Sequence, residues 1–256
     1  MTGVVQSYGA GVQSRALLHM ALDGRFPRPD RVIFADTQAE PQDVYRTLHE
    51  DQTTCQREGI PFDTITHGDL SATDQWGGVY VPAHTLHPTT GDRGMLRRQC
   101  THEFKVAPIK RHLRALGYER VTLWLGITTD EAARMKPGSA KWLTHTYPLI
   151  DAGMNRTDCE TYLEERGLRA TKSACVFCPY RSRYGWAKVR ANPRDWQAAI
   201  TYDNAVRHAR PDGGELFVHP DRVPLEQASI PDLSVMTSLF DDGGGFGNEC
   251  EGHCGV

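Results

Sequence analysis

Five of the seven cysteines in this chain have a spacing that indicates a site. Cys175 and Cys178 form a Cys-x-x-Cys pair, Cys100 follows two arginines, and Cys250 and Cys254 lie near the last residue. An odd number of cysteines argues against a disulfide framework and favours reduced thiols in a cytoplasmic protein. The pattern therefore predicts a metal site or thiol chemistry.

A glycine-rich loop near the N-terminus, Ser7-Tyr-Gly-Ala-Gly-Val-Gln-Ser14, has the composition of a phosphate cradle. Glycines let the backbone approach an anion, and a helix behind them directs its unpaired N–H groups at it. The alternative is an ordinary tight turn between a strand and a helix. The spacing is not the Rossmann fingerprint and no Gly-Lys-Ser/Thr follows, which argues against a hydride enzyme or a Walker-type NTPase.

Composition sets the remaining limits. A chain of 256 residues can bury a substantial core, and a formal charge of −3 argues against a uniformly basic nucleic-acid binder. No run of about 18 apolar residues is present, so we expect no membrane-spanning helix. The N-terminus lacks the basic flank and apolar core of a signal peptide, so we expect a cytoplasmic protein.

Short apolar runs alternate with helical patterns in the first half of the chain, which predicts an α/β fold with a parallel sheet covered by helices on both faces. Strands are expected at 4–7, 31–35, 62–66 and 121–126. Helices are expected at 12–24, 41–58, 101–116, 157–165 and 195–209. We expect a nucleotide-binding domain over 1–167 and a smaller C-terminal region over 168–256.

Two stretches have no regular pattern. Residues 69–97 are rich in Gly, Pro, Thr and His, and we interpret them as an irregular active-site loop. Residues 241–247 are dominated by glycine and are expected to form a hinge before Cys250.

Polar side chains gather where the predicted strands end. Asp36 follows the second strand, and Asp130, Glu131 and Arg134 follow the strand that ends near Gly126. Ligands bind at this edge in open parallel sheets. Carboxylates there can bind Mg²⁺, which usually bridges the phosphates of a substrate.

A basic segment without acidic residues follows the Cys-x-x-Cys pair. It contains Arg181, Arg183, Lys188 and Arg190, with Tyr184 and Trp186 between them. Basic groups interleaved with aromatic rings suit a nucleic-acid backbone and an exposed base. The alternatives are a solvated helix face with a core tryptophan, or a grip on the phosphates of a mononucleotide.

Five segments, in order, resemble the PP-loop ATP pyrophosphatases, specifically the branch of phosphoadenylyl-sulfate reductases and sulfur-inserting nucleic-acid enzymes. They are Ser7–Ser14, Asp36-Thr-Gln-Ala-Glu-Pro41 with Tyr45, Gln99-Cys-Thr-His-Glu-Phe-Lys-Val-Ala-Pro108, Gly126-Ile-Thr-Thr-Asp-Glu131 with Arg134, and Tyr147-Pro-Leu-Ile150 followed by Cys175-Val-Phe-Cys-Pro179. The resemblance implies an adenine nucleotide alpha hydrolase-like fold. It implies nucleotide binding by Ser7, Tyr8, Gly9, Ala10, Gly11, Val12, Gln13, Ser14, Asp36, Thr37, Gly126 and Arg134.

The chain departs from the family pattern at two positions. Gln13 replaces the aspartate of the family loop, and Gln99-Cys100 replaces the Cys-Cys pair of the reductases. The first change removes a carboxylate that could handle metal or phosphate. The second removes one ligand of the cluster that adenylyl-sulfate reductases carry.

The resemblance groups Cys100, Cys175 and Cys178 as three thiolate ligands of an iron–sulfur cluster, expected to be 4Fe-4S. Cys254, or alternatively Cys250, would complete it, or one iron would stay open for sulfide or substrate. Structural zinc and a metal-free redox pair are the alternatives. The tail thiol Cys254 is instead catalytic if it attacks sulfur, as in the reductases.

The implied activity is ATP-dependent adenylation of an acceptor oxygen, with release of pyrophosphate, followed by sulfur insertion. ATP and Mg²⁺ are the implied cofactors, and Asp36, Asp130 and Glu131 the catalytic carboxylates. We favour a nucleic-acid acceptor, with DNA phosphorothioation ahead of tRNA thiolation. The expected partners are a cysteine desulfurase or other sulfur donor and further subunits of a modification system. A homodimer is compatible with this activity. The alternatives are a phosphoadenylyl-sulfate or adenylyl-sulfate reductase and a catalytically degenerate nucleotide-binding subunit.

Overall fold

The computed structural model describes residues 1–74, 78–138, 140–169 and 171–235. Across these ranges, none of the helices combines the length and apolar character needed to cross a lipid bilayer.

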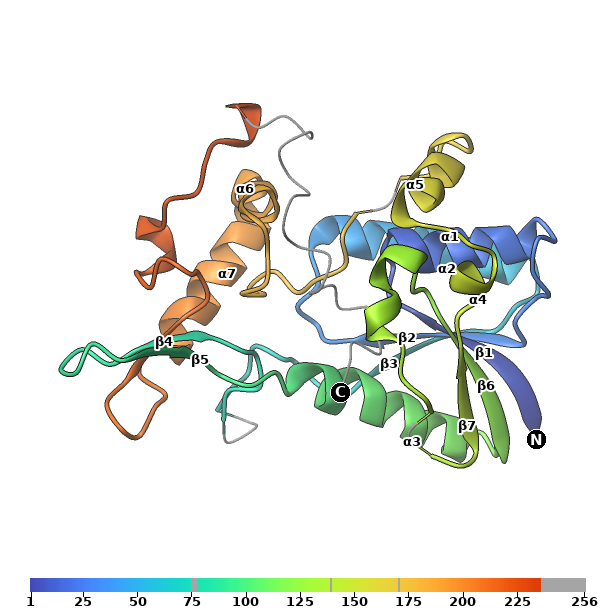
Figure 1. The fold of residues 1–256 in the computed structure, drawn as a ribbon, viewed down its shortest axis with the longest axis horizontal. Helices are drawn as coiled ribbons and strands as arrows, with labels where there is room; N and C mark the ends of the chain where they lie inside the picture. Colours follow the sequence, from blue (N-terminus) through green and yellow to red (C-terminus); the bar gives the residue numbers. More distant parts are fainter. Residues whose placement is uncertain (75–77, 139, 170, 236–256) are drawn as a thin grey trace.

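A five-stranded parallel sheet forms the centre of the N-terminal part of the chain (Figure 1). Its strand order is β3-β2-β1-β6-β7, with β1 Thr2–Tyr8, β2 Arg31–Asp36, β3 Phe62–Thr66, β6 Arg120–Leu125 and β7 Leu143–Thr146. The four predicted strands are confirmed. The edge strand β7 was not predicted, because its sequence Leu-Thr-His-Thr is short and mostly polar.

Helices cover both faces of this sheet, as predicted (Figure 1). On one face lie α1 (Val12–Leu22), α2 (Gln42–Arg57) and α5 (Arg156–Glu164), and on the other lies α3 (Ala107–Ala115). Two short helical turns, η2 (Thr129–Arg134) and α4 (Pro148–Asp151), follow β6 and β7. A π-helix, η1 (His102–Val106), leads into α3, so the predicted helix 101–116 is two joined elements.

The remaining elements form a second, smaller layer. The strands β4 (His84–Leu86), β5 (Arg93–Met95) and β8 (Glu215–Phe217) pair antiparallel in the order β5-β4-β8. Beside them lie α6 (Arg183–Ala191), α7 (Pro193–Val206) and the short turns η3 (Leu225–Gln227) and η4 (Leu233–Val235). The expectation that 69–97 is irregular throughout is therefore wrong, because this stretch contains the β4–β5 hairpin. The two strands could not be recognised in the sequence, because each is only three residues long.

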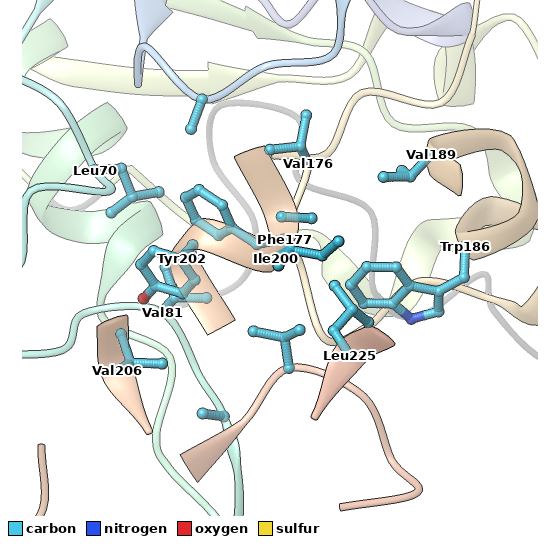
Figure 2. Close-up of a cluster of buried hydrophobic side chains, with 14 of the residues drawn as sticks. Leu70, Val81, Val176, Phe177, Trp186, Val189, Ile200, Tyr202, Val206 and Leu225 are labelled. Carbon is cyan, nitrogen blue, oxygen red and sulfur yellow. The ribbon is translucent and has the colours of Figure 1, made fainter. Parts of the chain in front are cut away.

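A hydrophobic core holds this second layer together (Figure 2). Leu70 and Val81, from the stretch before β4, pack with Val176 and Phe177 and with residues of α6 and α7. The core therefore draws on both sides of residue 167. Segments far apart in the sequence are fixed against one another here, which matters for the cysteines beside them.

The main sheet brings three loops to one edge. The central strand β1 pairs with β2 on one side and β6 on the other, and Ser7 lies opposite both Ile33 and Leu125. The loops that start at Gly9, Thr37 and Gly126 consequently leave the same, carboxyl edge of neighbouring strands. This is the position at which open parallel sheets bind ligands.

Candidate functional site

The loop after β1 has the geometry of an anion cradle. The backbone N–H groups of Gly9 and Gly11 both donate to Ser14 Oγ, each at 3.2 Å, and Gly11 is the N-cap of α1. Between them, Ala10 adopts a left-handed conformation with φ of 56°. Amides that converge on one oxygen in front of a helix N-terminus form a concavity suited to a phosphate oxygen.

Two buried hydroxyl groups at this edge lack a hydrogen-bond partner among the described residues. They are Ser7 Oγ, at the end of β1, and Thr128 Oγ1, just beyond β6. Their residues are 3% and 0% exposed. An unpaired buried hydroxyl is costly, so a polar ligand at this edge would relieve both. These groups, with the loop amides, fit the phosphates of a nucleotide.

Gln13 and Glu131 join the first and third of the edge loops. Gln13 Nε2 donates to one oxygen of the Glu131 carboxylate at 3.2 Å, and Arg134 Nη1 donates to the other at 2.5 Å. Glu131 is only 3% exposed. The structure therefore gives Gln13 a partner that an aspartate would repel, and it makes Glu131 the link between α1 and η2.

Asp36 lies at the end of β2, as predicted. Its Oδ1 accepts hydrogen bonds from the Tyr45 hydroxyl and from the backbone N–H of Gln38, both at 2.8 Å. Burial and the nearby Asp36 charge raise the pKa of Tyr45, which keeps the phenol a donor. Asp36 is thus a positioned carboxylate at the carboxyl edge of the sheet, which we call the nucleotide edge because its loops fit phosphate groups.

Two of the residues predicted for the site lie elsewhere. The Tyr8 side chain belongs to the core between the sheet and α2, where its hydroxyl donates to Asp51. Asp130 is exposed, and its carboxylate accepts from the backbone N–H of Arg156 at the start of α5. These placements leave only the Tyr8 backbone for the cradle, and they give no support to a catalytic role for Asp130.

A pocket beside this edge brings together the three cysteines that lie far apart in the sequence. Cys100, Cys175 and Cys178 line it, together with Thr37 and Glu40 from the loop after β2. Leu70, Val81, Pro82, Arg98, Lys105 and Tyr180 complete the lining. None of the three forms a disulfide bond in the described part of the chain. Thiols and nucleotide-edge residues therefore share one cavity.

The second core sets the position of the Cys-x-x-Cys pair. The two residues between the cysteines, Val176 and Phe177, are 3% and 1% exposed and point into that core (Figure 2). The Phe177 ring stacks on Tyr202 with centroids 3.7 Å apart. Arg181 donates to the carbonyls of Ala174 and Cys175 at 2.6 and 2.9 Å. The turn is fixed from both sides, which leaves the cysteines facing the pocket.

A further backbone contact ties the turn to the nucleotide edge. The Val176 N–H donates to the Ala39 carbonyl at 2.8 Å. Ala39 is next to Glu40, so the turn and the loop after β2 are held in register. Cys100 is placed separately, because its N–H donates to the Tyr80 carbonyl at 2.9 Å.

Electrostatics in the pocket involve both thiols and an ion pair. A hydrogen bond with Cys178, burial, and the nearby Cys178, Cys100 and Glu40 raise the pKa of the Cys175 thiol. Lys105 Nζ, on the π-helix, lies 3.1 Å from Glu40 Oε1, with the two side chains 6% and 0% exposed. Glu40 Oε2 is buried without a hydrogen-bond partner in the described part of the chain.

The donor set fits an iron–sulfur cluster in its chemistry. Clusters of this kind are held by cysteine thiolates, and three thiols converge here from two chain segments. In the described part of the chain, no three Cys, His, Asp or Glu side chains are arranged to hold a single metal ion. Cys250, Cys254 and the predicted hinge 241–247 lie outside the described residues, so the proposed fourth ligand and the tail thiol stay predictions.

The basic segment forms a helix with a core tryptophan, which is one of the alternatives expected from its sequence. Arg181 and Arg190 donate to backbone carbonyls, and Trp186 is 1% exposed in the second core. Lys188 Nζ lies 4.4 Å from the centroid of the Tyr184 ring. The tryptophan is therefore a core residue and not a stacking platform, while Arg183, Lys188 and Arg190 remain exposed on α6.

Four polar lining residues were not predicted as site residues from the sequence. Glu40 and Lys105 lie within segments recognised for other reasons, and Arg98 and Tyr180 each lie two positions from a pocket cysteine. For Arg98 and Tyr180, the signal available in the sequence was their position next to these cysteines. The ion pair itself joins residues 65 positions apart and has no local signature.

Residues 3–170 match the family model of the phosphoadenosine phosphosulfate reductase domain. The chain belongs to this family. It is a PP-loop protein, as the motifs indicated, and at the family level its chemistry is that of ATP-using, sulfur-related enzymes. No protein with a curated function matches the chain.

Among solved structures, the chain is similar to the U34-tRNA thiolase NcsA from Methanococcus maripaludis, solved with its [4Fe-4S] cluster. The identity is 12%, the TM-score is 0.42, and the match covers 82% of this chain and 73% of that one. At this level the likeness carries no inference about activity.

Proposed function

We propose that this reductase-domain protein is an ATP-dependent sulfur-transfer enzyme. An acceptor oxygen attacks the α-phosphorus of ATP and pyrophosphate leaves; sulfur at the oxidation level of sulfide then attacks the activated acceptor atom and AMP leaves. The observation that carries the proposal is the shared pocket, which three cysteine thiols line together with Thr37 and Glu40 of the nucleotide edge.

The first step depends on positioning and charge neutralisation. The amides of Gly9 and Gly11 and the N-terminus of α1 would hold the phosphates, with the hydroxyls of Ser7 and Thr128 as further donors. Asp36 would hold a Mg²⁺ ion, which would supply positive charge to neutralise the phosphates. Gln13 and Arg134, held by Glu131, keep the loops after β1 and β6 together around the nucleotide.

The second step takes place beside the thiols. Cys100, Cys175 and Cys178 would hold an iron–sulfur cluster, and the fourth ligand position, which Cys254 or Cys250 would otherwise fill, would stay open. Such a cluster supplies an iron at which sulfide can bind. Lys105 brings positive charge into the pocket, where AMP is displaced, and Glu40 holds that ammonium in place.

The acceptor we propose is a nucleic acid, with the DNA backbone ahead of a tRNA base, and the sulfur donor a cysteine desulfurase. The desulfurase delivers a persulfide, and a thiol reductant would supply the two electrons that release its outer sulfur as sulfide. Support comes from the exposed Arg183, Lys188 and Arg190 on α6, which begins five residues after Cys178. Such side chains supply the phosphate contacts of nucleic-acid binding. Other subunits of a modification system would complete the reaction.

Labelled ATP tests the proposal. We expect AMP and pyrophosphate in the presence of DNA, sulfide and Mg²⁺, and phosphorothioate linkages in the digested DNA. Ser14→Ala should slow AMP formation, whereas Thr53→Ala, on the exposed face of α2, should not. Sulfite release from an adenylyl sulfate would instead identify a reductase. ATP binding without turnover on any acceptor would contradict the proposal and identify a binding subunit.

A further inference from the structure

The cysteines of the thiol pocket lie in two stretches of the sequence whose charged residues are all basic. Residues 93–102 contain three arginines and residues 166–194 contain eight lysines and arginines, and neither stretch contains an Asp or Glu. Since the whole chain has a formal charge of −3, the remainder is acidic. Each basic stretch contains cysteines of the pocket: Cys100 lies in the first, and Cys175 and Cys178 in the second.

One residue from each stretch lines the pocket next to its cysteine. Arg98 precedes Cys100 by two positions, and Tyr180 follows Cys178 by two. The guanidinium carbon of Arg98 lies 4.4 Å from the centroid of the Tyr180 ring. Both residues line the pocket and are half-buried, so part of each remains accessible to solvent.

Stacking gives this arginine a defined orientation. A guanidinium that lies on an aromatic face keeps its planar N–H groups directed outward at the ring edge, where they can bind phosphate oxygens in pairs. The stacking also removes side-chain freedom before binding, which lowers the entropy cost of holding an anion. A lysine has neither property.

We infer that Arg98 and Tyr180 form the entrance through which an acceptor strand reaches the thiols, with Arg98 binding a phosphodiester group and Tyr180 positioning Arg98. The inference rests on the proposed function, which it deepens by naming where the acceptor binds. The ligand is a phosphodiester strand, which DNA and RNA share. The neighbouring α6 residues extend the contact along the backbone of the strand.

The affinity of the protein for a nucleic-acid strand tests the inference directly. Fluorescence anisotropy of labelled single-stranded DNA, and of RNA with the same sequence, gives Kd for the wild type and for the variants Arg98→Ala, Arg98→Lys, Tyr180→Ala and Tyr180→Phe. The matched control is Arg57→Ala, an exposed arginine on α2 outside both basic stretches. Thermal melting of each variant confirms that it is folded.

We expect Arg98→Ala and Tyr180→Ala to raise Kd about tenfold and the former to lower the salt dependence by about one ion. Arg98→Lys should recover only part of the affinity, and Tyr180→Phe should bind like wild type, because the ring and not the hydroxyl carries the stack. The DNA and RNA arms show which strand binds more tightly.

Equal Kd values for wild type and Arg98→Ala would overturn the inference. So would a loss of adenylyl-sulfate binding in Arg98→Ala with strand binding intact, which would make the pair a small-nucleotide site. Both results leave the proposed function standing if wild-type AMP formation depends on DNA. Absence of AMP formation with every acceptor, beside strand binding that depends on Arg98, would instead reject the proposed function.

Discussion

The ion pair between Lys105 and Glu40 gives the sharpest stability prediction. The two side chains are 6% and 0% exposed and their charged atoms are 3.1 Å apart. Lys105→Met leaves the Glu40 carboxylate buried without its cation, and the loss of one partner of such a pair costs about 3–5 kcal/mol of unfolding free energy. Replacing both partners, in Glu40→Met with Lys105→Met, removes the uncompensated charge and should recover most of that loss.

Urea denaturation followed by tryptophan fluorescence measures these differences. The matched control is Arg46→Met, which breaks an ion pair of 3.0 Å whose side chains are 69% and 52% exposed. A surface pair of this kind contributes less than about 1 kcal/mol. If Lys105→Met destabilises no more than Arg46→Met, or if the double variant is less stable than Lys105→Met alone, the assignment of a buried ion pair to the pocket is refuted.

Three further predictions follow from the contacts of the site and the core. Phe177→Ala removes a 1% exposed ring stacked on Tyr202, and we expect a loss of about 3–5 kcal/mol in urea denaturation; a loss below 1 kcal/mol would contradict the anchoring of the Cys-x-x-Cys turn. Glu131→Ala releases Gln13 and Arg134 and should raise the Kd for ATP about tenfold by titration calorimetry, or about 1.4 kcal/mol; an unchanged Kd would show that this link does not shape the nucleotide edge. Burial lowers the pKa of His84, His145 and His219, so the unfolded chain binds more protons than the folded chain as pH falls through the ordinary value of 6.5. Tm should therefore be lower at pH 5.5 than at pH 7.5. A higher Tm at pH 5.5 would contradict this prediction.

The strands and helices of the main sheet were predictable because their signal is local. Val32-Ile-Phe-Ala35 is a continuous apolar run of the kind that central parallel strands require, and α1 begins directly after its glycine loop. The β4–β5 hairpin was missed, because strands of three residues lack a clear period. What stabilises them is the second core, which forms only between distant segments.

The candidate site also has parts that the sequence predicts and parts that depend on contacts between distant residues. The loop Gly9–Gly11 and the cysteines were identifiable from residue type and spacing. The partner of Gln13 was not, since Glu131 is 118 positions away. The exposed position of Asp130 was equally hard to predict, because it depends on which face of its helical turn meets the rest of the chain.

The central claim is that Cys100, Cys175 and Cys178 act as one sulfur site. Iron and acid-labile sulfide, determined in protein purified without oxygen together with its visible spectrum, test this most directly. We predict about four irons and four sulfides per chain, with a broad band bleached by dithionite, in the wild type and in Cys55→Ala, whose cysteine is buried in a core away from the pocket. Cys100→Ala should lose both iron and sulfide. One zinc and no sulfide, or a cluster that survives in Cys100→Ala, would contradict the claim.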